Sequence, residues 1–366
     1  MTTDVPRLER VIATPKFRET APDKPWQHYM TIDTINTVLQ RSLLHPFIAW
    51  MVPLSMRAQL TPYHFTSMKV AIAYATLITI LWILGVVNKR VAHGLPRDVD
   101  LSDEVIVITG GGSGLGQLIA EVYGMRGASV AILDVQDGKE AEAKGIAYYK
   151  CDVGSREQIQ DTAKQIEQDL GTPTILINNA GVMNGKSLLD LSFEDVERTM
   201  RTNLLSHFYT IKTFLPGMLN EGRGTIVTVS SVLGNLGAAN LSDYTASKAA
   251  LNALHASLKA ELELSTHESA PWIRTILCCP GQLSTSLFAG VRTPSNFLAP
   301  IVEPVEIAKE IIKLVDAGES GDISAPLYAR WIGLYGILPV GVRKIARHLS
   351  GIDYAMISRS ASPPKN

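Results

Sequence analysis

The chain has 366 residues, of which 46% are hydrophobic and 19% are charged, and its formal net charge is −1. This composition is globular, with length enough for one large domain and additional segments. The near-neutral charge argues against nucleic acid as a partner, because nucleic-acid-binding proteins present a basic surface. Three cysteines make no disulfide framework in so long a chain, and no Cys/His spacing resembles a metal site, so we expect a reducing compartment and no metal.

An apolar region precedes the rest of the chain. Residues 43–56 are apolar but contain Pro46 and Pro53, which should break the stretch, so we interpret it as interfacial or re-entrant. Residues 70–87 carry no charge, and as a helix they span about 27 Å, slightly less than the roughly 30 Å hydrocarbon core of a bilayer. We predict a membrane-attachment region over residues 40–90, either a single span or a hairpin.

Short β-branched runs alternate with helical segments from residue 103 onward. The strand candidates are residues 104–110, 129–135, 145–153, 172–181, 224–231 and 273–281. This alternation predicts an α/β fold, a doubly wound parallel sheet with helices on both faces.

The composition also predicts where the parts of the chain begin and end. The predicted parts are a polar, weakly ordered segment (1–39), the attachment region (40–90), a linker (91–102), a dinucleotide-binding domain (103–330) and a basic, apolar tail (331–366). Deletion of residues 1–98 is therefore expected to leave a folded domain.

A glycine-rich turn, TGGGSGLG, lies between the first predicted strand and the first predicted helix. Glycines there let the backbone approach a pyrophosphate, which the N-terminus of the following helix attracts. The G-x-G-x-x-G register does not fit; the spacing is T-G-x-x-x-G-x-G, at Thr109, Gly110, Gly114 and Gly116. With a strand before it and a helix after it, this turn predicts a dinucleotide site.

Asp134 closes the second predicted strand, about twenty residues after the turn. A carboxylate at this position accepts hydrogen bonds from the ribose hydroxyls and repels a 2′-phosphate. No Arg or Lys lies within residues 109–117 or directly after Asp134 to bind that phosphate. We therefore expect NAD rather than NADP; the alternative is an ordinary Asp at a strand-end turn.

Tyr244 and Lys248 are four residues apart in a helical stretch, so their side chains share one face. The pair alone is weak evidence, because both residues are common on half-exposed helices. Three further motifs strengthen it: the glycine-rich turn, N-N-A-G at residues 178–181, and P-G-x-x-x-T at residues 280–285. Ser231 also lies thirteen residues before Tyr244.

These linked motifs resemble those of the short-chain dehydrogenase/reductase family over roughly residues 103–330, in the order and approximate spacing of that family. The resemblance implies a Rossmann-type fold and an NAD(P)-dependent oxidoreductase that acts on CH–OH groups. The apolar N-terminal region and the Leu-Pro-containing tail resemble, more narrowly, the membrane-associated retinol and 17β-hydroxysteroid dehydrogenase-like group.

The resemblance implies a role for each matching residue. Tyr244 would be the general acid/base and Lys248 its electrostatic partner and a ribose ligand. Ser231 would hold the substrate oxygen and Asn203 a proton-relay water; a turn residue and a polar helix residue are the structural alternatives. The other implied cofactor contacts are Thr109, Gly110, Ser113, Gly114, Leu115, Gly116, Asp134, Asp152, Val153, Asn179, Ala180, Gly181, Pro280, Gly281, Leu283 and Thr285.

The Tyr/Lys spacing has a chemical reason. A free tyrosine has a pKa near 10 and is a poor base at neutral pH. A cation about 4 Å away at an effective dielectric constant of about 20 contributes about 4 kcal/mol, or roughly three pKa units. We therefore expect Lys248 and the positive nicotinamide of the oxidised cofactor to bring the Tyr244 pKa close to neutrality.

The C-terminal sequence suggests a lipophilic substrate. Residues 284–302 are expected to form an apolar lid, with Leu287, Phe288, Val291, Phe297, Leu298 and Ile301. Residues 329–366 hold six Arg/Lys and one Asp among aromatic and aliphatic residues, which fits either a membrane-surface segment or packing over the pocket. We expect a retinoid, a steroid or a long-chain alcohol. The alternatives are a dehydrogenase of a small polar alcohol and a non-catalytic NAD-binding membrane scaffold; a homodimer stays open.

The charges that flank the apolar run bear on orientation. Lys89, Arg90 and Arg97 follow the run, and Arg57 and Lys69 precede it. This bias places the domain in the cytosol. A glycan on Asn240, the acceptor of the sequence's one N-x-S/T site, would obstruct Tyr244, which agrees with a cytosolic domain. We expect attachment to the endoplasmic reticulum, to lipid droplets or to both.

Overall fold

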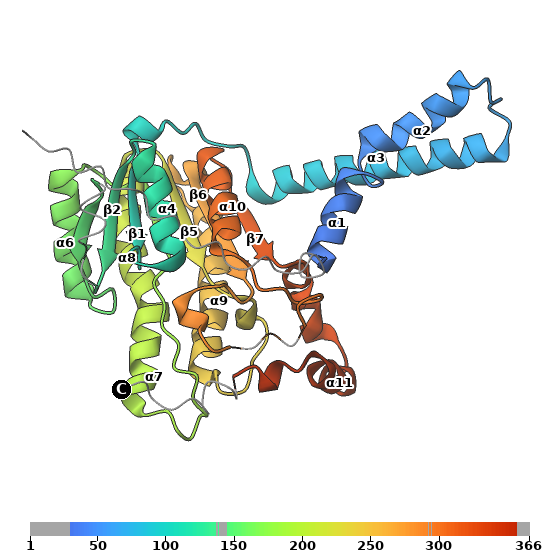
Figure 1. Cartoon of the computed structure of the whole chain (residues 1–366). Helices are drawn as coiled ribbons and strands as arrows, with labels where there is room; N and C mark the ends of the chain where they lie inside the picture. Colours follow the sequence, from blue (N-terminus) through green and yellow to red (C-terminus); the bar gives the residue numbers. More distant parts are fainter. Residues whose placement is uncertain (1–29, 137, 139–144, 292, 294, 357–366) are drawn as a thin grey trace, which may run out of the picture.

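The computed structural model describes residues 30–136, 138, 145–291, 293 and 295–356. Its centre is a seven-stranded parallel sheet in the order β3-β2-β1-β4-β5-β6-β7 (Figure 1). The strands are β1 (Val105–Thr109), β2 (Ser129–Asp134), β3 (Ala147–Lys150), β4 (Ile175–Asn178), β5 (Gly224–Val229), β6 (Ile273–Pro280) and β7 (Gly321–Ala325). The predicted doubly wound α/β fold is confirmed.

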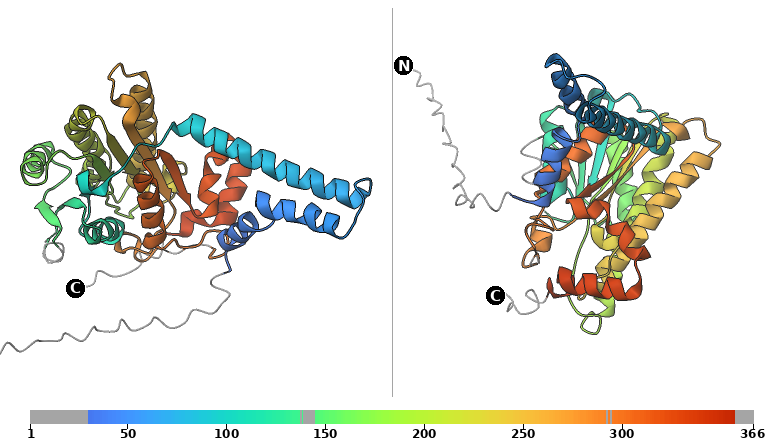
Figure 2. Two further views of the ribbon diagram at one scale, coloured as in Figure 1. Left: turned by 90° about the horizontal axis from the view of Figure 1, so that it is seen from above. Right: turned by 90° about the vertical axis from the view of Figure 1, so that its right-hand side faces the viewer.

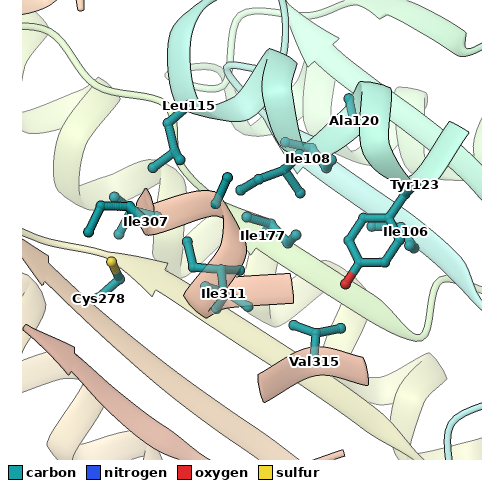
Figure 3. Close-up of a cluster of buried hydrophobic side chains, with 14 of the residues drawn as sticks. Ile106, Ile108, Leu115, Ala120, Tyr123, Ile177, Cys278, Ile307, Ile311 and Val315 are labelled. Atoms are coloured by element: carbon teal, nitrogen blue, oxygen red, sulfur yellow. The ribbon is translucent and has the colours of Figure 1, made fainter. Parts of the chain in front are cut away.

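Helices cover both faces of the sheet, and alternate residues of β1 show which helices cover which face. Ile106 and Ile108 pack in one cluster with α4 (Gly114–Met125) and α10 (Pro304–Asp316) (Figure 3). Val105 and Val107 belong to the opposite cluster. That cluster also contains residues of α6 (Arg156–Asp169), α8 (Ser206–Asn220) and α9 (Ser242–Leu264). The period of two along β1 thus separates the two helical layers.

The six predicted strands are confirmed, and β7 is a seventh that the sequence analysis missed. Its sequence, GDISA, contains one large apolar residue, Ile323, and lacks the β-branched run that marks the other strands. It lies at the edge of the sheet and pairs only with β6. Tertiary pairing rather than local propensity makes it a strand.

In the described part of the chain, three α-helices precede the sheet: α1 (Ile32–Arg41), α2 (Pro46–Ala58) and α3 (Thr66–His93). The expectation of weak order up to residue 39 is wrong for α1; residues 1–29 lie outside the described part of the chain. The expectation that Pro53 breaks the apolar stretch is also wrong, because α2 runs through it. Ala49 and Pro53 are buried, in agreement with packing against α3 that offsets the hydrogen bond lost at proline.

The α2 and α3 helices form a hairpin that projects from the sheet (Figure 1). Trp50 Nε1 donates to Thr79 Oγ1 at 2.9 Å, and the Tyr74 hydroxyl donates to the Leu43 carbonyl at 2.5 Å. Most of the large apolar side chains of α3 are exposed. Among the described residues, α3 is the one helix long and apolar enough to cross a membrane.

Both ends of the hairpin are fastened to the sheet domain (residues 104–330). Before α2, the Ile32 amide donates to the Phe297 carbonyl at 3.1 Å, and Asp33 Oδ1 accepts from the Leu327 amide at 2.6 Å. At the C-terminal end of α3, Lys89 pairs with Glu319 at 2.6 Å, and Lys259 donates to the Ala92 carbonyl at 2.7 Å. The hairpin therefore leaves the domain and returns to it on one side.

The predicted linker, residues 91–102, is also bound to the domain. Arg97 is 5% exposed; its guanidinium pairs with Glu104 at 2.6 Å and donates to Thr225 at 3.1 Å. Since this charge is buried, it is wrong to count Arg97 among the surface charges that follow the apolar run. The predicted cytosolic orientation of the domain then depends on Lys89 and Arg90.

The C-terminal segment both packs on the domain and exposes apolar side chains. It contains short 3₁₀ turns (Leu327–Arg330, Ile332–Ile337 and Ile352–Tyr354) and α11 (Val340–Ser350). Arg347 pairs with Asp353 and donates to the Gly237 carbonyl, and Met356 is buried. The end of this segment therefore packs on the domain, which is one of the two alternatives that its composition predicted. Residues 357–366 of the predicted tail lie outside the described residues.

Candidate active site

The predicted site residues surround one cavity of about 450 Å³ at the carboxyl ends of the central strands. This is the edge at which open parallel sheets bind ligands. All the predicted site residues line the cavity except Thr109, Gly116 and Asn203. The structure thus brings together residues from seven separate sequence segments, while their contacts with a cofactor stay a prediction.

The glycine-rich turn has a backbone that other residues cannot easily adopt. Gly110 has a φ of +65°, and a Cβ there would lie 2.8 Å from the Ala180 Cα. A Cβ on Gly116 would lie 2.4 Å from the Gly110 carbonyl oxygen. The chain can therefore pass close to the Asn179–Ala180 turn only with glycine at these positions.

Thr109 and Asn179 hold this turn from behind. Thr109 Oγ1 accepts from the amides of Asn179 at 3.0 Å and Ala180 at 3.1 Å. Asn179 Nδ2 in turn donates to the carbonyls of Thr109 and Gly110. This explains why Thr109 belongs to the motif although it does not line the cavity.

Asp134 lies at the end of β2, where it is 8% exposed and lines the cavity. Its Oδ2 accepts from the Gly112 amide at 2.8 Å, and its Oδ1 accepts from the Gln136 amide at 3.1 Å. The carboxylate thus stabilises the glycine turn, as the alternative of an Asp at a strand-end turn predicted. The predicted ribose contact would use the remaining lone pairs of the same oxygens.

The residues present fit a dinucleotide. The glycine turn opens on the cavity through Ser113 and Gly114, at the N-terminus of α4. Amides at a helix N-terminus attract phosphate groups. Asp152 and Val153 line the same cavity beyond β3, as the predicted adenine-side positions require.

Ser231, Tyr244 and Lys248 meet on the cavity wall, Ser231 two residues after the end of β5 and the other two on α9. All three are at most 3% exposed. Lys248 Nζ lies 5.7 Å from the centroid of the Tyr244 ring and donates to the Val229 carbonyl at 2.8 Å. A hydrogen bond with Ser231 favours the ionised form of Tyr244. The four-residue spacing therefore does place both side chains at one point.

Burial dominates the ionisation of this pair. It raises the pKa of Tyr244 to about 12, although the hydrogen bond with Ser231 lowers it in part. Burial also lowers the pKa of Lys248 to about 8. The protein groups alone thus do not bring the Tyr244 pKa towards neutrality; the predicted shift, which combined Lys248 with the positive nicotinamide, stays a prediction. Lowering it requires an additional positive charge, which an oxidised nicotinamide carries.

Asn203 is completely buried in a π-helical turn, Arg201–Leu205. Its Nδ2 donates to the Val182 carbonyl at 2.9 Å and to Ser247 Oγ at 3.1 Å, and its Oδ1 accepts from the Val182 amide at 2.8 Å. Both amide hydrogens are used, so the side chain has the structural role. The relay-water role of this residue stays a prediction.

One wall of the cavity is apolar. Phe288 meets the Tyr244 ring edge-to-face, with centroids 6.5 Å apart. Leu287, Phe288 and Val291 pack with Tyr244 and Met356, as expected of an apolar lid. The other three predicted lid residues, Phe297, Leu298 and Ile301, are instead exposed.

The sequence analysis missed several residues of the site. Met356 is 1% exposed in the cluster that holds Tyr244, but it lies in the tail, far from any motif. Arg198 and Thr202 line the cavity from the helical stretch before Asn203. Their closeness to that residue, five positions and one position before it, is the one signal that could have found them.

Comparisons with known proteins agree with this site. The family model described as short chain dehydrogenase matches residues 104–296. An uncharacterised oxidoreductase of Saccharomyces cerevisiae is 35% identical over 252 residues, which cover 68% of this chain and 82% of the relative. Human retinol dehydrogenase 10 is 33% identical over 256 residues, covering 60% and 74%. Mouse epidermal retinol dehydrogenase 2 is 34% identical over 245 residues, covering 64% and 78%.

A solved structure supports the fold. The ligand-free aldohexose dehydrogenase of Thermoplasma acidophilum superposes with a TM-score of 0.52 at 24% identity, covering 67% of this chain and 98% of that protein. The family model spans more than half of the chain, and it includes the glycine turn, Ser231, Tyr244 and Lys248. This chain therefore belongs to the short-chain dehydrogenase family and is an oxidoreductase of that family.

Proposed function

We propose that the protein transfers a hydride between NAD(H) and a lipophilic alcohol or ketone, such as a retinoid, a steroid or a long-chain alcohol. The observation that carries the proposal is the apolar cluster around Tyr244, in which Phe288, Val291 and Met356 pack beside the phenol. A substrate whose oxygen reaches Tyr244 would have its carbon skeleton against these side chains. The similarity to retinol dehydrogenases supports the same substrate class.

The mechanism uses three side chains. When bound, the nicotinamide cofactor supplies the hydride acceptor or donor. In alcohol oxidation, the Ser231 hydroxyl holds the substrate oxygen and Tyr244 takes its proton; in ketone reduction, Tyr244 returns the proton. Lys248, within 5.7 Å of the ring centroid, stabilises the phenolate when it carries its charge.

Asp134 supports NAD as the cofactor. The residues that follow it are Val135 and Gln136, neither of which carries the positive charge that a 2′-phosphate needs. Asp134→Asn combined with Val135→Arg is expected to shift preference toward NADP, measured as the ratio of the two dissociation constants. Stronger binding of NADP than of NAD by the unaltered chain would contradict this assignment.

For its location, we propose attachment through residues 40–90 to the endoplasmic reticulum, to lipid droplets or to both, with the sheet domain in the cytosol. The exposed apolar surface of α3 and the reduced, buried cysteines support this location. Protease added to sealed microsomes should digest the domain from outside. Protection that lasts until detergent is added would overturn the orientation.

The substrate class is tested with the full chain in detergent or vesicles. NAD reduction is followed with a panel of retinoid, steroid, long-chain and sugar alcohols, and Tyr244→Phe is the control for background reduction. We expect turnover with at least one lipophilic class and little with sugars. Turnover of sugars alone would favour the polar-alcohol alternative. NAD binding without turnover of any alcohol or of the matching ketones would favour the scaffold.

A further inference from the structure

The two fastened ends of the hairpin define one face of the sheet domain. Ile32 and Asp33 bind the domain before the hairpin, and Ala92 accepts a hydrogen bond from it afterwards. With 13 residues, α2 is about 20 Å long, short of the roughly 30 Å hydrocarbon core. A hairpin of this kind enters one leaflet and returns from it. The face of the domain between its two ends then lies against the lipid headgroups.

The C-terminal segment lies on this same face. In Figure 2 (right), which looks at the side from which the hairpin projects, α11 and the turns before it are seen together with α1 and the hairpin. Large apolar side chains of this segment are strongly exposed, above all Ile337 (79%), Leu349 (78%) and Val340 (72%). They lie on the same face of the domain as the base of the hairpin, whose own apolar side chains are exposed in the same way, and the turn Leu327–Arg330 contacts α1.

The α11 helix is amphipathic but buries nothing. Val342, Ile345 and Leu349, at the i, i+3, i+7 spacing of one helical stripe, are all exposed. A helix in a water-soluble domain normally buries such a stripe against its neighbours. Among the described residues, no buried side chain occurs anywhere in α11. Its apolar stripe is therefore available to a partner outside this chain.

The charges around the stripe identify that partner. Lys344 and Arg347 lie on the opposite face of α11, and Arg330 is exposed earlier in the same segment. Between residues 326 and 356 the single acidic residue is Asp353, which pairs with Arg347. An apolar stripe opposite a basic face is typical of helices that lie in the interface of a membrane with anionic lipids.

The segment also continues into the apolar wall of the active-site cavity. Asp353 accepts a hydrogen bond from the Ala239 amide, and Met356, three residues on, is buried beside Tyr244. Val291, which belongs to the same cluster, precedes the stretch that bonds to α1 through Phe297. The apolar side of the cavity therefore lies directly behind the surface that exposes α11.

We propose that residues 330–354 form a second membrane contact, the docking segment, which binds an anionic phospholipid surface beside the hairpin. It holds the apolar wall of the cavity against the leaflet, so that a lipophilic substrate passes from the lipid into the site without crossing water. Contact with lipid stands independently of catalysis. The route of the substrate rests on the proposed function.

Lipid contact is tested with a fluorophore on a single cysteine, because Cys151, Cys278 and Cys279 are all buried. The full chain carrying Ile337→Cys is reconstituted in phosphatidylcholine/phosphatidylserine vesicles that contain spin-labelled lipid. The matched control is Leu189→Cys, 95% exposed in the turn before α7 (Phe193–Met200), which Figure 1 shows away from the hairpin. We expect quenching of the Ile337 probe and none of the Leu189 probe. No quenching at residue 337, as when a protein partner or a second copy covers the segment, would overturn the proposal.

The charge contribution is tested with Arg330→Glu and Lys344→Glu together, and Lys164→Glu on α6 is the control. Removing each basic residue should weaken docking on phosphatidylserine vesicles about fivefold, seen as lost quenching of the Ile337 probe. Equal quenching with and without phosphatidylserine would contradict the anionic partner.

The same double variant tests the route of the substrate. The KM for an alcohol dissolved in the vesicles should rise, while the dissociation constant of NAD should not change. An unchanged KM despite lost quenching would overturn the route and leave the lipid contact intact. If no alcohol were turned over, the proposed function would fail, and the quenching experiment would still decide the lipid contact.

Discussion

The side of the cavity that we propose holds the cofactor (the cofactor side) and the side that we propose holds the substrate (the substrate side) are built differently. The cofactor side consists of strand ends and tight turns whose backbone is fixed by hydrogen bonds, such as those that Thr109 Oγ1 accepts from the Asn179 and Ala180 amides. The substrate side consists of side chains from distant segments, Phe288 and Met356 among them, which only packing holds together. The first is specified by local sequence and tolerates little change. The second can vary in shape without disturbing the first.

Tyr244 lies where the two sides meet, so its substitution should have the largest effect. Tyr244→Phe keeps the ring and its contact with Phe288 but removes the hydroxyl that we propose carries the proton. We expect turnover to fall about a thousandfold, while NAD affinity changes little. Steady-state kinetics and NAD titration check this. Turnover within tenfold of the unaltered chain would reject the proposed role.

Lys248 connects the site to the stability of the fold. Its pKa is lowered from 10.5 to about 8 by burial, so the folded chain binds fewer protons than the unfolded chain between these values. The resulting destabilisation is complete below about pH 8 and disappears as the pH rises through about 10.5. Lys248→Met should therefore stabilise the inactive protein by up to about 3 kcal/mol at pH 7, and less at higher pH.

Denaturant unfolding of both chains over this pH range measures the effect. A difference that does not change with pH would mean that the lysine charge is not its cause.

Gly110 tests the cofactor side. Gly110→Ala places a side chain at a φ of +65° and against the Ala180 backbone. Gly127→Ala is the matched control, because Gly127 has a φ of +79° with nothing within 4 Å. Both variants should lose about 1–2 kcal/mol of stability through backbone strain, but only Gly110→Ala should also lose NAD affinity. Equal NAD affinities in the two variants would show that the close approach of Gly110 to the Ala180 backbone does not affect NAD binding.

Phe288 tests the substrate side, with a smaller expected effect. Phe288→Ala removes apolar contact worth about 1–2 kcal/mol, so the KM for a lipophilic alcohol should rise about tenfold while the dissociation constant of NAD holds. Phe193→Ala, at a position 86% exposed on α7, is the control. A loss of NAD affinity in Phe288→Ala would mean that the two sides are not independent.

This difference also explains what the sequence could predict. The strands and the glycine turn were predictable because β-branched runs and positive-φ glycines leave local signals. The edge strand β7, the burial of Met356 and the passage of α2 through Pro53 depend on contacts with distant segments. The opposing effect of burial on the Tyr244 pKa was not predictable for a related reason, since the spacing shows that Lys248 is near but not how deeply both groups are buried.

The buried Arg97–Glu104 pair decides where the chain can be cut to obtain a domain without its membrane region. Glu104 also accepts a hydrogen bond from Thr174, and its side chain is fully enclosed. Cutting after residue 98, as the sequence analysis suggested, would remove Arg97 and leave this carboxylate without its cation, at a cost of about 3–5 kcal/mol. A fragment that starts at Gly94 keeps the pair, so the folded domain begins inside the predicted linker.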